Sequence, residues 1–294
     1  MTYHRRQFGA LGQSEIASSG PYFIPDIYEG DMAAPNFSAI AAQPSVVGCI
    51  LKATDGVAYS PAWFTNNWNR LRAAGGSRYG DSWFRGCYHF GRPNAHGAVQ
   101  ADFLLGAVQR AGGWGDGDMP PAWDLEGSSW AANSNQQIID ISSQFSARIK
   151  DRIGKTPVLY AGSLIRDRGI ADRMGFDRLW TPQINMQAAR WPVSDYSLWQ
   201  YAGDGGGPRG YDLRANYPGA FAFPLAFPGW TRSDGYGSDM NVVMDNGRPA
   251  SSIRSVRSIL TGGSGILLPL VIGGALFTVA FAIYRRFGTS KSGS

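Results

Sequence analysis

Apolar residues along this chain follow two spacings in turn, and this alternation predicts five strand–helix pairs between residues 22 and 174. Short apolar runs bounded by Gly, Pro or polar residues predict strands at 22–28, 46–53, 82–90, 121–126 and 157–161. Apolar residues three or four positions apart predict helices at 36–43, 61–74, 98–111, 135–153 and 164–174. The fourth helix has the clearest pattern, because Ile138, Ile141, Phe145 and Ile149 fall on one face.

Beyond residue 174 the helical spacing stops. Three strand-like runs follow, at 178–183, 197–201 and 210–213. Five βα units and three further strands give eight strands, which is enough to close one barrel. The predicted fold class is therefore α/β, with a single (β/α)-type barrel of five βα units followed by three β-strands over residues 21–222.

The segments on either side of this barrel differ from it in composition. Residues 1–20 are polar and rich in Ser and Gly, which predicts a flexible N-terminal arm; Arg5 and Arg6 precede no apolar core, so a signal peptide is not expected. Residues 223–264 lack periodicity and contain many Gly and Pro residues, which predicts an irregular extension or linker.

Residues 266–284 form an uncharged apolar run 19 residues long. As a helix this run would span about 28 Å, close to the hydrocarbon thickness of a bilayer. A buried core helix is the alternative, but core helices rarely reach this length without a polar residue. The sequence therefore predicts a C-terminal transmembrane helix at 265–286 and a short basic tail at 287–294.

The distribution of charge and the positions of the cysteines and histidines argue against a nucleic-acid partner and against a metal site. The net charge is +5, but the basic residues are scattered, so nucleic acid is not an expected partner. Cys49 and Cys87 lie in apolar runs and are expected to be buried free thiols. The three histidines have no ligand-type spacing with these cysteines, so neither a metal nor a cofactor is expected.

The candidate chemistry begins with Asp124 and Glu126, at the end of the fourth predicted strand. Side chains two apart on a strand point to the same face, with their Cα atoms about 7 Å apart. Most isolated Asp-x-Glu pairs are solvated surface carboxylates, but here a Pro-Pro entry precedes the pair and Gly127 follows it. Glycosidic bond cleavage is one reaction that uses two neighbouring carboxyl groups.

Functional groups of α/β barrels lie at the C-terminal ends of the strands. The predicted strand ends carry Asp26, Lys52, Asp55, Tyr88, His89, Asp124, Glu126, Tyr160, Trp180, Gln183, Trp199, Gln200, Tyr201 and Asp212. Because the first and eighth strands of a closed barrel are neighbours, we expect Asp26 and Asp212 side by side, facing Asp124 and Glu126. Carboxylates among aromatic rings suit a carbohydrate ligand.

The order of these motifs resembles family 25 of the glycoside hydrolases, the lysozymes that cut peptidoglycan. The matching pieces are DIYEG at 26–30, LKATDG at 51–56, GCYHF at 86–90, QADF at 100–103, PAWDLE at 121–126, VLY at 158–160, LW at 179–180, LWQY at 198–201 and YD at 211–212. The resemblance covers residues 21–222. It implies the same barrel and cleavage of the β-1,4 bond between N-acetylmuramic acid and N-acetylglucosamine.

The resemblance also implies roles for single residues. Glu126 would be the general acid, Asp124 would hold the substrate's acetamido group, and Asp26 and Asp212 would support them. The residues expected to bind the glycan are Tyr88, Trp199 and Tyr201, with Tyr160 and Trp180 beside them at their strand ends. One departure is Glu29, where the family usually carries Gln.

A lysozyme barrel joined to a membrane anchor suggests a bacteriophage lytic protein, located in a virion membrane or the host cell membrane. Its expected partners are peptidoglycan glycan strands, the lipid bilayer and other virion proteins. A non-catalytic, membrane-anchored wall-binding or structural virion protein is the main alternative; a chitinase-like enzyme is a weaker one. Asp26, Asp124, Glu126 and Asp212 are all present, which argues against a site that has lost its catalytic activity.

Overall fold

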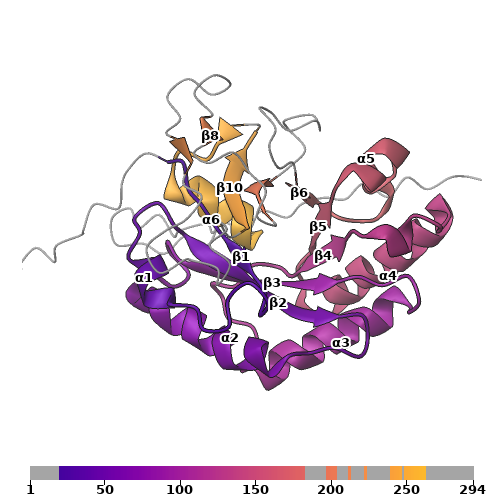
Figure 1. Ribbon diagram of the computed structural model, residues 1–294, viewed down its shortest axis with the longest axis horizontal. Coiled ribbons are helices and arrows are strands. Elements are labelled where there is room, and N and C mark those ends of the chain that lie inside the picture. Colours follow the sequence, from indigo (N-terminus) through magenta and orange to yellow (C-terminus); the bar gives the residue numbers. More distant parts are fainter. Residues whose placement is uncertain are drawn as a thin grey trace, which may run out of the picture. The chain divides into compact units, whose positions relative to one another are not determined.

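A computed structural model describes residues 20–182, 197–203, 211–212, 222–223, 239–246 and 248–262. The first part of the chain folds into the five predicted βα units (Figure 1). The strands are β1 (Asp26–Ile27), β2 (Gly48–Asp55), β3 (Phe84–Phe90), β4 (Ala122–Leu125) and β5 (Val158–Ala161). The helices are α1 (Phe37–Ala41), α2 (Ala62–Gly75), α3 (Gly97–Arg110), α4 (Asn135–Ile153) and α5 (Ser163–Arg168).

Short 3₁₀ turns and later strands complete the described elements. The turns are η1 (Gly76–Arg78), η2 (Ser128–Trp130) and η3 (Ala171–Arg173). The later elements are β6 (Arg178–Pro182), β7 (Leu198–Ala202), β8 (Tyr211–Asp212), β9 (Ala222–Phe223), β10 (Met240–Asp245), β11 (Arg248–Pro249) and α6 (Ile253–Thr261).

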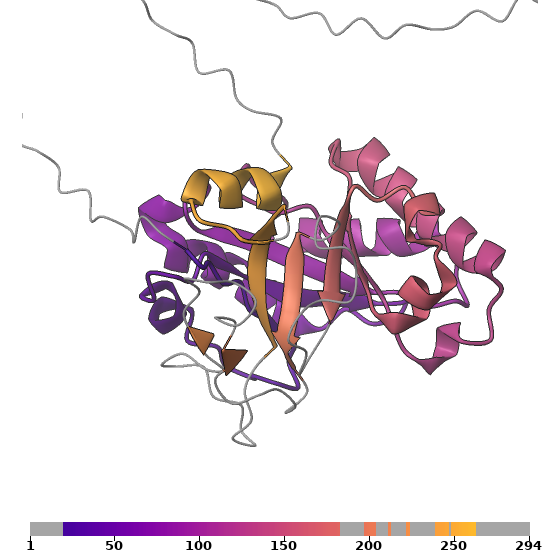
Figure 2. The same cartoon turned by 90° about the horizontal axis from the view of Figure 1, so that it is seen from above.

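Seven parallel strands and one antiparallel strand form a nearly closed barrel. Strands β1 to β7 pair in chain order, and β10 pairs antiparallel with β7. The ring closes where the Ile24 N–H donates to the Asn241 carbonyl at 3.0 Å and the Asp26 N–H donates to the Asp239 carbonyl at 3.0 Å. Figure 2 shows β10 beside β7, with the parallel strands curving away from them.

The eighth strand is therefore not the one expected from the sequence. Residues 210–213 were expected to close the barrel, but Tyr211–Asp212 pairs with Ala222–Phe223 in a separate two-stranded sheet. The segment 223–264, expected to be irregular, contains the closing strand β10 and the helix α6. The barrel thus extends past residue 222, and the compact unit that contains it runs to Gly263.

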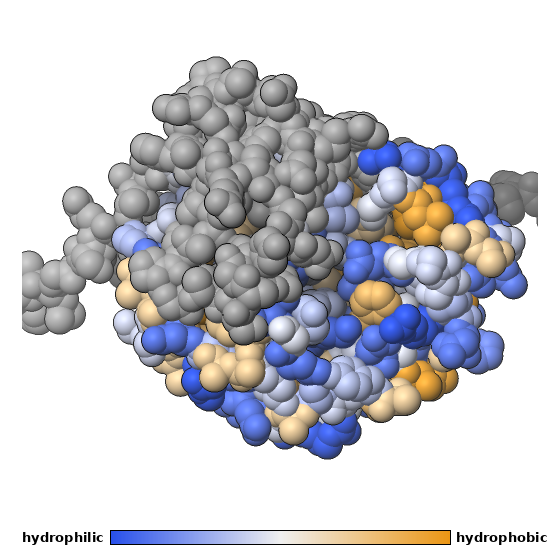
Figure 3. Space-filling model, viewed as in Figure 1, coloured by the Kyte–Doolittle hydropathy of each residue, from blue (hydrophilic) through white to orange (hydrophobic). Residues whose placement is uncertain are grey.

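Alternating side chains build two apolar layers, one inside the barrel and one between the strands and helices. The interior layer includes Ile50, Phe84 and Leu198, together with Val256 and Leu260 of α6. The outer layer holds Trp123, Phe145, Ile149 and other side chains of the helices. Helix α4 begins at a Ser134–Gln137 capping box and ends at Gly154 with a left-handed backbone. The visible solvent-facing surface of the helices is mostly hydrophilic (Figure 3).

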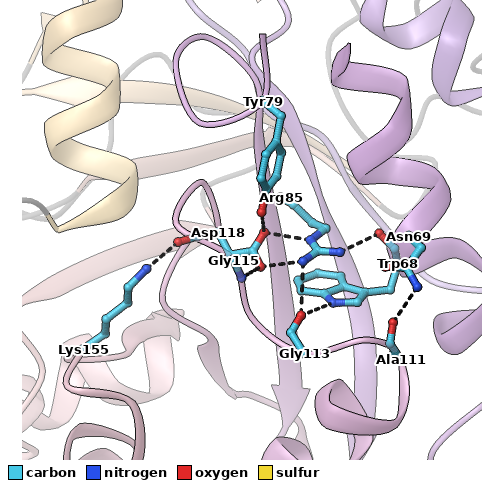
Figure 4. A network of polar contacts seen from close by, with 9 residues as sticks. All are labelled: Trp68, Asn69, Tyr79, Arg85, Ala111, Gly113, Gly115, Asp118 and Lys155. Carbon is cyan, nitrogen blue, oxygen red and sulfur yellow. Dashed lines mark hydrogen bonds and ion pairs between the residues drawn. The ribbon is translucent and has the colours of Figure 1, made fainter. Parts of the chain in front are cut away.

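A buried ion pair stands near the N-terminal end of β3 (Figure 4). Arg85 donates to both carboxylate oxygens of Asp118, at 2.7 and 2.6 Å, and both side chains are almost fully buried. The Tyr79 hydroxyl and the Gly115 N–H also donate to Asp118, each at 2.6 Å. The guanidinium lies 3.7 Å from the centre of the Trp68 ring. The buried charges of Arg85 and Asp118 therefore compensate each other.

The terminal predictions fall largely beyond the part of the chain that the structure describes. Residues 1–19, the apolar run 266–284 and the tail 287–294 lie outside it. Among the described helices, none has both the length and the apolar character needed to cross a bilayer.

Candidate active site

The strand ends bring Asp26 and Asp124 to the interior of the barrel mouth. Asp26 begins β1 and Asp124 lies in β4, and each is 5 % exposed. On β4, Trp123 and Leu125 point to the outer apolar layer, so Asp124 points inward by the two-residue period. Glu126 follows directly after the strand and is partly buried. The charge of Glu126 acts on both Asp124 and Tyr160, which places it within electrostatic reach of the barrel interior.

Asp26 is held by a row of hydrogen-bonding side chains. Its Oδ2 accepts from the Asn241 amide at 2.7 Å and from the Gln200 amide at 3.4 Å. Asn241 Oδ1 in turn accepts from the Trp180 indole at 2.6 Å, and Gln200 Oε1 accepts from the Tyr160 hydroxyl at 2.7 Å. Strands β1, β5, β6, β7 and β10 are thereby joined through one polar network at the barrel interior.

Burial raises the pKa of Asp26 well above its usual range, and the charge of Asp239 acts in the same direction. The hydrogen bond from Asn241 opposes this shift. Burial also raises the pKa of Asp124, followed by the charge of Glu126, while Lys52 acts against the rise. Asp124 Oδ1 is buried and has no hydrogen-bond partner among the described residues.

These shifts bear on the expected role of Asp124, because a carboxyl group that accepts a hydrogen bond from the substrate's acetamido group must be ionised. Two neighbouring carboxylates in a desolvated site do not ionise together at low cost. Asp124 is the more buried of the two, so in the free protein it retains a proton to higher pH than an exposed aspartate does. Proton uptake by Asp124 is therefore coupled to the charge of Glu126.

Three of the predicted glycan-binding rings lie on the interior face. Tyr160 and Trp180 meet edge to face with ring centres 4.7 Å apart, and Tyr88 meets Trp180 in the same way at 6.3 Å. The structure thus brings Tyr88, Tyr160 and Trp180 together with the Asp26 network.

Trp199 and Tyr201 do not join this group. Both are essentially fully buried in the outer apolar layer, and Tyr201 packs against Phe23 with ring centres 6.2 Å apart. Gln200, between them, is the residue of β7 that reaches Asp26. The prediction that Trp199 and Tyr201 line the groove is therefore not met, because strand alternation turns them to the opposite face of the barrel wall.

Asp212 lies in β8, with its backbone opposite Ala222, and only its backbone is described. The residue paired with Asp26 across the closing strand is Asp239 instead. Asp239 and Asn241 were missed by the sequence reasoning. Their signal was the segment 239–245, which begins with an Asp-x-Asn spacing that puts both side chains on one face of a strand.

His89 lies near the end of β3 and is fully buried, with its ring turned away from the barrel mouth. Its Nδ1 lies 2.7 Å from the Thr54 hydroxyl and its Nε2 lies 3.0 Å from Gln100 Oε1. Since Gln100 Oε1 can only accept, the ring proton is assigned to Nε2. The ring stacks on Trp123 at 5.4 Å, and burial lowers the pKa of His89 to about 4.

Replacing His89 with Gln is expected to make the free energy of unfolding depend less on pH between about pH 4 and 6.5. The unfolded histidine has a pKa of about 6.5, whereas the folded value is about 4, so the unfolded chain takes up the proton first. The contribution of neutral His89 is complete above about pH 6.5 and is lost as pH falls toward 4. The expected loss over this interval is on the order of 3 kcal/mol. Urea unfolding of both proteins across this range measures it, and equal pH slopes would contradict the assignment.

The described residues contain no cluster of three or more His, Cys, Asp or Glu side chains arranged to hold a metal ion. Cys49 and Cys87 are free thiols, and both are buried. The chemistry of the described mouth is carried by carboxyl groups, amides and aromatic rings.

Comparison with known proteins agrees with this arrangement. The family model for glycosyl hydrolases family 25 matches residues 26–208. The N,O-diacetylmuramidase of Chalaropsis sp. is 35 % identical over 119 residues, which cover 38 % of this chain and 53 % of that protein. Lysozyme M1 of Streptomyces globisporus is 29 % identical over 193 residues, which cover 60 % of this chain and 61 % of that protein.

Among solved structures, the muramidase from Trichobolus zukalii superposes with a TM-score of 0.58 at 21 % identity, covering 82 % of this chain and 100 % of that one. This likeness concerns the fold. The chain spans about half the length of the first curated relatives it matches. With the family model matching well over half of its residues, the chain belongs to glycosyl hydrolases family 25.

Proposed function

We propose that the barrel is a muramidase that hydrolyses the β-1,4 bond between N-acetylmuramic acid and N-acetylglucosamine in peptidoglycan. The observation that carries the proposal is the placement of Asp124 and Glu126 at the end of β4, in a mouth that also holds Asp26. Family membership supports the reaction class. The named activities of the Chalaropsis and Streptomyces relatives support the bond.

In the proposed mechanism Glu126 donates a proton to the leaving glycosidic oxygen. Asp124 accepts a hydrogen bond from the N–H of the 2-acetamido group, whose carbonyl oxygen attacks the anomeric carbon. This role requires Asp124 to be ionised when substrate is bound. The charge of Lys52 lowers the pKa of Asp124 and thus favours the ionised form. Asp26, held by Asn241 and Gln200, would shape the far side of the mouth.

Attack by the acetamido group retains the anomeric configuration, whereas direct attack by water with Asp124 as the base inverts it. Proton NMR of the newly formed reducing end, recorded before mutarotation, distinguishes the two. We expect retention.

The bond specificity predicts which sugar carries the new reducing end. After digestion of purified peptidoglycan and borohydride reduction, mass spectrometry is expected to show muropeptides that end in reduced muramic acid. Products ending in reduced glucosamine would contradict a muramidase and favour cleavage of the other glycosidic bond. No release above a buffer control would favour the non-catalytic wall-binding alternative.

We further propose that residues 266–284 anchor the protein in a membrane and that it serves a bacteriophage in wall penetration or host lysis. The uncharged run of 19 residues supports the anchor. The fold likeness to the catalytic domain of an endolysin from bacteriophage P40 of Listeria monocytogenes, with a TM-score of 0.56, supports the compatibility of this barrel with a phage role.

Membrane fractionation of the full chain and of a chain that ends at Gly263 tests the anchor. The shortened chain keeps α6, whose Leu260 is buried in the barrel interior. Equal fractionation would rule out the anchor. Detection of the protein in purified virions would support the phage role, and its presence only in uninfected host membranes would exclude it.

A further inference from the structure

A pocket of about 490 Å³ lies at the C-terminal ends of β1, β2 and β3. Its lining comes from the end of β2 and from the segments that follow these three strands, and includes Tyr28, Glu29, Lys52, Asp55, Tyr59 and Arg92. Phe90 connects it to the catalytic strand, because Phe90 is the register partner of Asp124. The Lys52 ammonium lies 4.7 Å and the Arg92 guanidinium 4.5 Å from the centre of the Phe90 ring. The charges of Lys52 and Arg92, which line the pocket, also act on Asp124 and lower its pKa.

Four charged side chains line this pocket: Glu29, Lys52, Asp55 and Arg92. Arg92 donates from Nε and Nη2 to the two oxygens of Asp55 at 2.6 and 2.8 Å, and Lys52 lies 3.5 Å from the same carboxylate. Arg92 Nη1 donates to none of the described residues, and the Arg92 side chain is 40 % exposed. Glu29 supplies a further carboxyl group, and Tyr28 and Tyr59 are exposed aromatic walls.

Arg92 is also held in place before any ligand arrives. Its backbone N–H donates to Gln100 Oε1 at 2.9 Å, and its carbonyl accepts from Gln100 Nε2 at 2.8 Å. The same Gln100 oxygen binds His89. The free edge of the guanidinium is therefore presented by a fixed loop, which reduces the ordering cost of binding.

We propose that this pocket binds the carboxylate-bearing peptide on the lactyl group of the muramic acid residue, with Arg92 Nη1 as the recognising donor. The inference rests on the proposed function, in which Asp124 holds the acetamido group at C2 of that sugar. The lactyl ether is on the adjacent carbon, C3, so its substituent leaves the sugar close to Asp124. Sugars of the glycan backbone are otherwise uncharged, and they do not account for a pocket lined by two cations and two carboxyl groups.

Calorimetry with the full-length chain tests the pocket independently of cleavage. The ligands are N-acetylmuramoyl-L-Ala-D-Glu and the same compound with its carboxyl groups amidated. We expect the carboxylate form to bind about tenfold more tightly, as charge-assisted hydrogen bonds allow. In Arg92→Met the difference should shrink to about twofold or less.

Arg148→Met is a matched control, because Arg148 binds Asp102 through the same two nitrogens at 2.9 Å each on the distant helix pair α3 and α4. It should keep the tenfold preference. Glu29→Gln removes a negative charge from the pocket lining and should therefore increase the preference for the carboxylate ligand. This second variant is expected to change the preference in the opposite direction to Arg92→Met.

Equal binding of the two ligands by the unaltered protein would overturn the proposal. A neutral sugar would then be the better candidate for the occupant of the pocket. A preference that survives in Arg92→Met would also overturn it, as would an equal loss of both ligands. Failure of the proposed function has a different signature: the carboxylate preference persists while peptidoglycan is not cleaved.

Discussion

Glu126→Gln is expected to lower kcat/KM for peptidoglycan cleavage by about 10²- to 10⁴-fold, the usual effect of losing one well-placed general acid. The amide has nearly the same shape but cannot deliver a proton to the leaving oxygen. Since Glu126 is only partly buried and follows β4, the variant should fold with an unchanged melting temperature. Initial rates of dye release from labelled cell walls, with thermal unfolding alongside, measure both properties.

Asp140→Asn serves as the control for this experiment. Asp140 is exposed on α4, where it accepts a hydrogen bond from Gln136 at 2.7 Å. Its activity should remain within about twofold of the unaltered protein, as surface substitutions have small effects. Full activity of Glu126→Gln would remove Glu126 from the role of acid and direct attention to the other carboxyl groups of the mouth.

The pH profile adds a separate readout. Because the proposed mechanism needs an ionised Asp124, kcat/KM should fall on the acid side as Asp124 takes up a proton. Burial raises the pKa of Asp124, so this fall should begin at a higher pH than an ordinary aspartate would give. Glu126→Gln removes a negative charge that also raises this pKa, so the acid limb of the residual rate should move to lower pH.

The five βα units could be predicted because each is a local pattern. Helix α4 shows why: Ile138, Phe145 and Ile149 fix its buried face, and Ser134 with Gln137 marks its start. The strand β4 is similar, since a short apolar run between Pro121 and Gly127 leaves little choice of element. Asp124 and Glu126 were therefore placed correctly at a strand end from sequence alone.

Closure of the barrel depends on pairing between distant segments, and local pattern does not determine it. Residues 210–213 were predicted as the last strand, and residues 240–245 fell in the segment 223–264, which was predicted to be irregular. In the structure, residues 239–243 make backbone hydrogen bonds with residues 22–26, and Val242 and Val243 are buried on opposite faces. The prediction therefore placed Asp212 beside Asp26 and missed Asp239 and Asn241.

The two rings of β7 illustrate a different limit. A period of two shows that Trp199 and Tyr201 share a face, but it does not show which face is inside the barrel. The polar residue between them was the available clue, since Gln200 needs a hydrogen-bond partner when buried and finds it in Asp26 and Tyr160. Site residues can thus be predicted where they belong to one contiguous motif. They cannot be predicted where strand pairing determines which side chains face the interior of the barrel.

Asp118→Asn is expected to destabilise the folded barrel by about 3–5 kcal/mol, because it leaves the Arg85 guanidinium charged, buried and uncompensated. Arg85 is 1 % exposed and Asp118 is fully buried, so water cannot replace the lost carboxylate. The exposed pair Arg148–Asp102 offers the comparison: Asp102→Asn should cost about 1 kcal/mol or less. Urea unfolding of the two variants measures the contrast, and similar losses would contradict the view that burial sets the cost. Arg85 lies on β3 upstream of Tyr88 and packs against Trp68 of the outer layer. The fraction of Asp118→Asn that remains folded should therefore retain full cleavage activity per molecule.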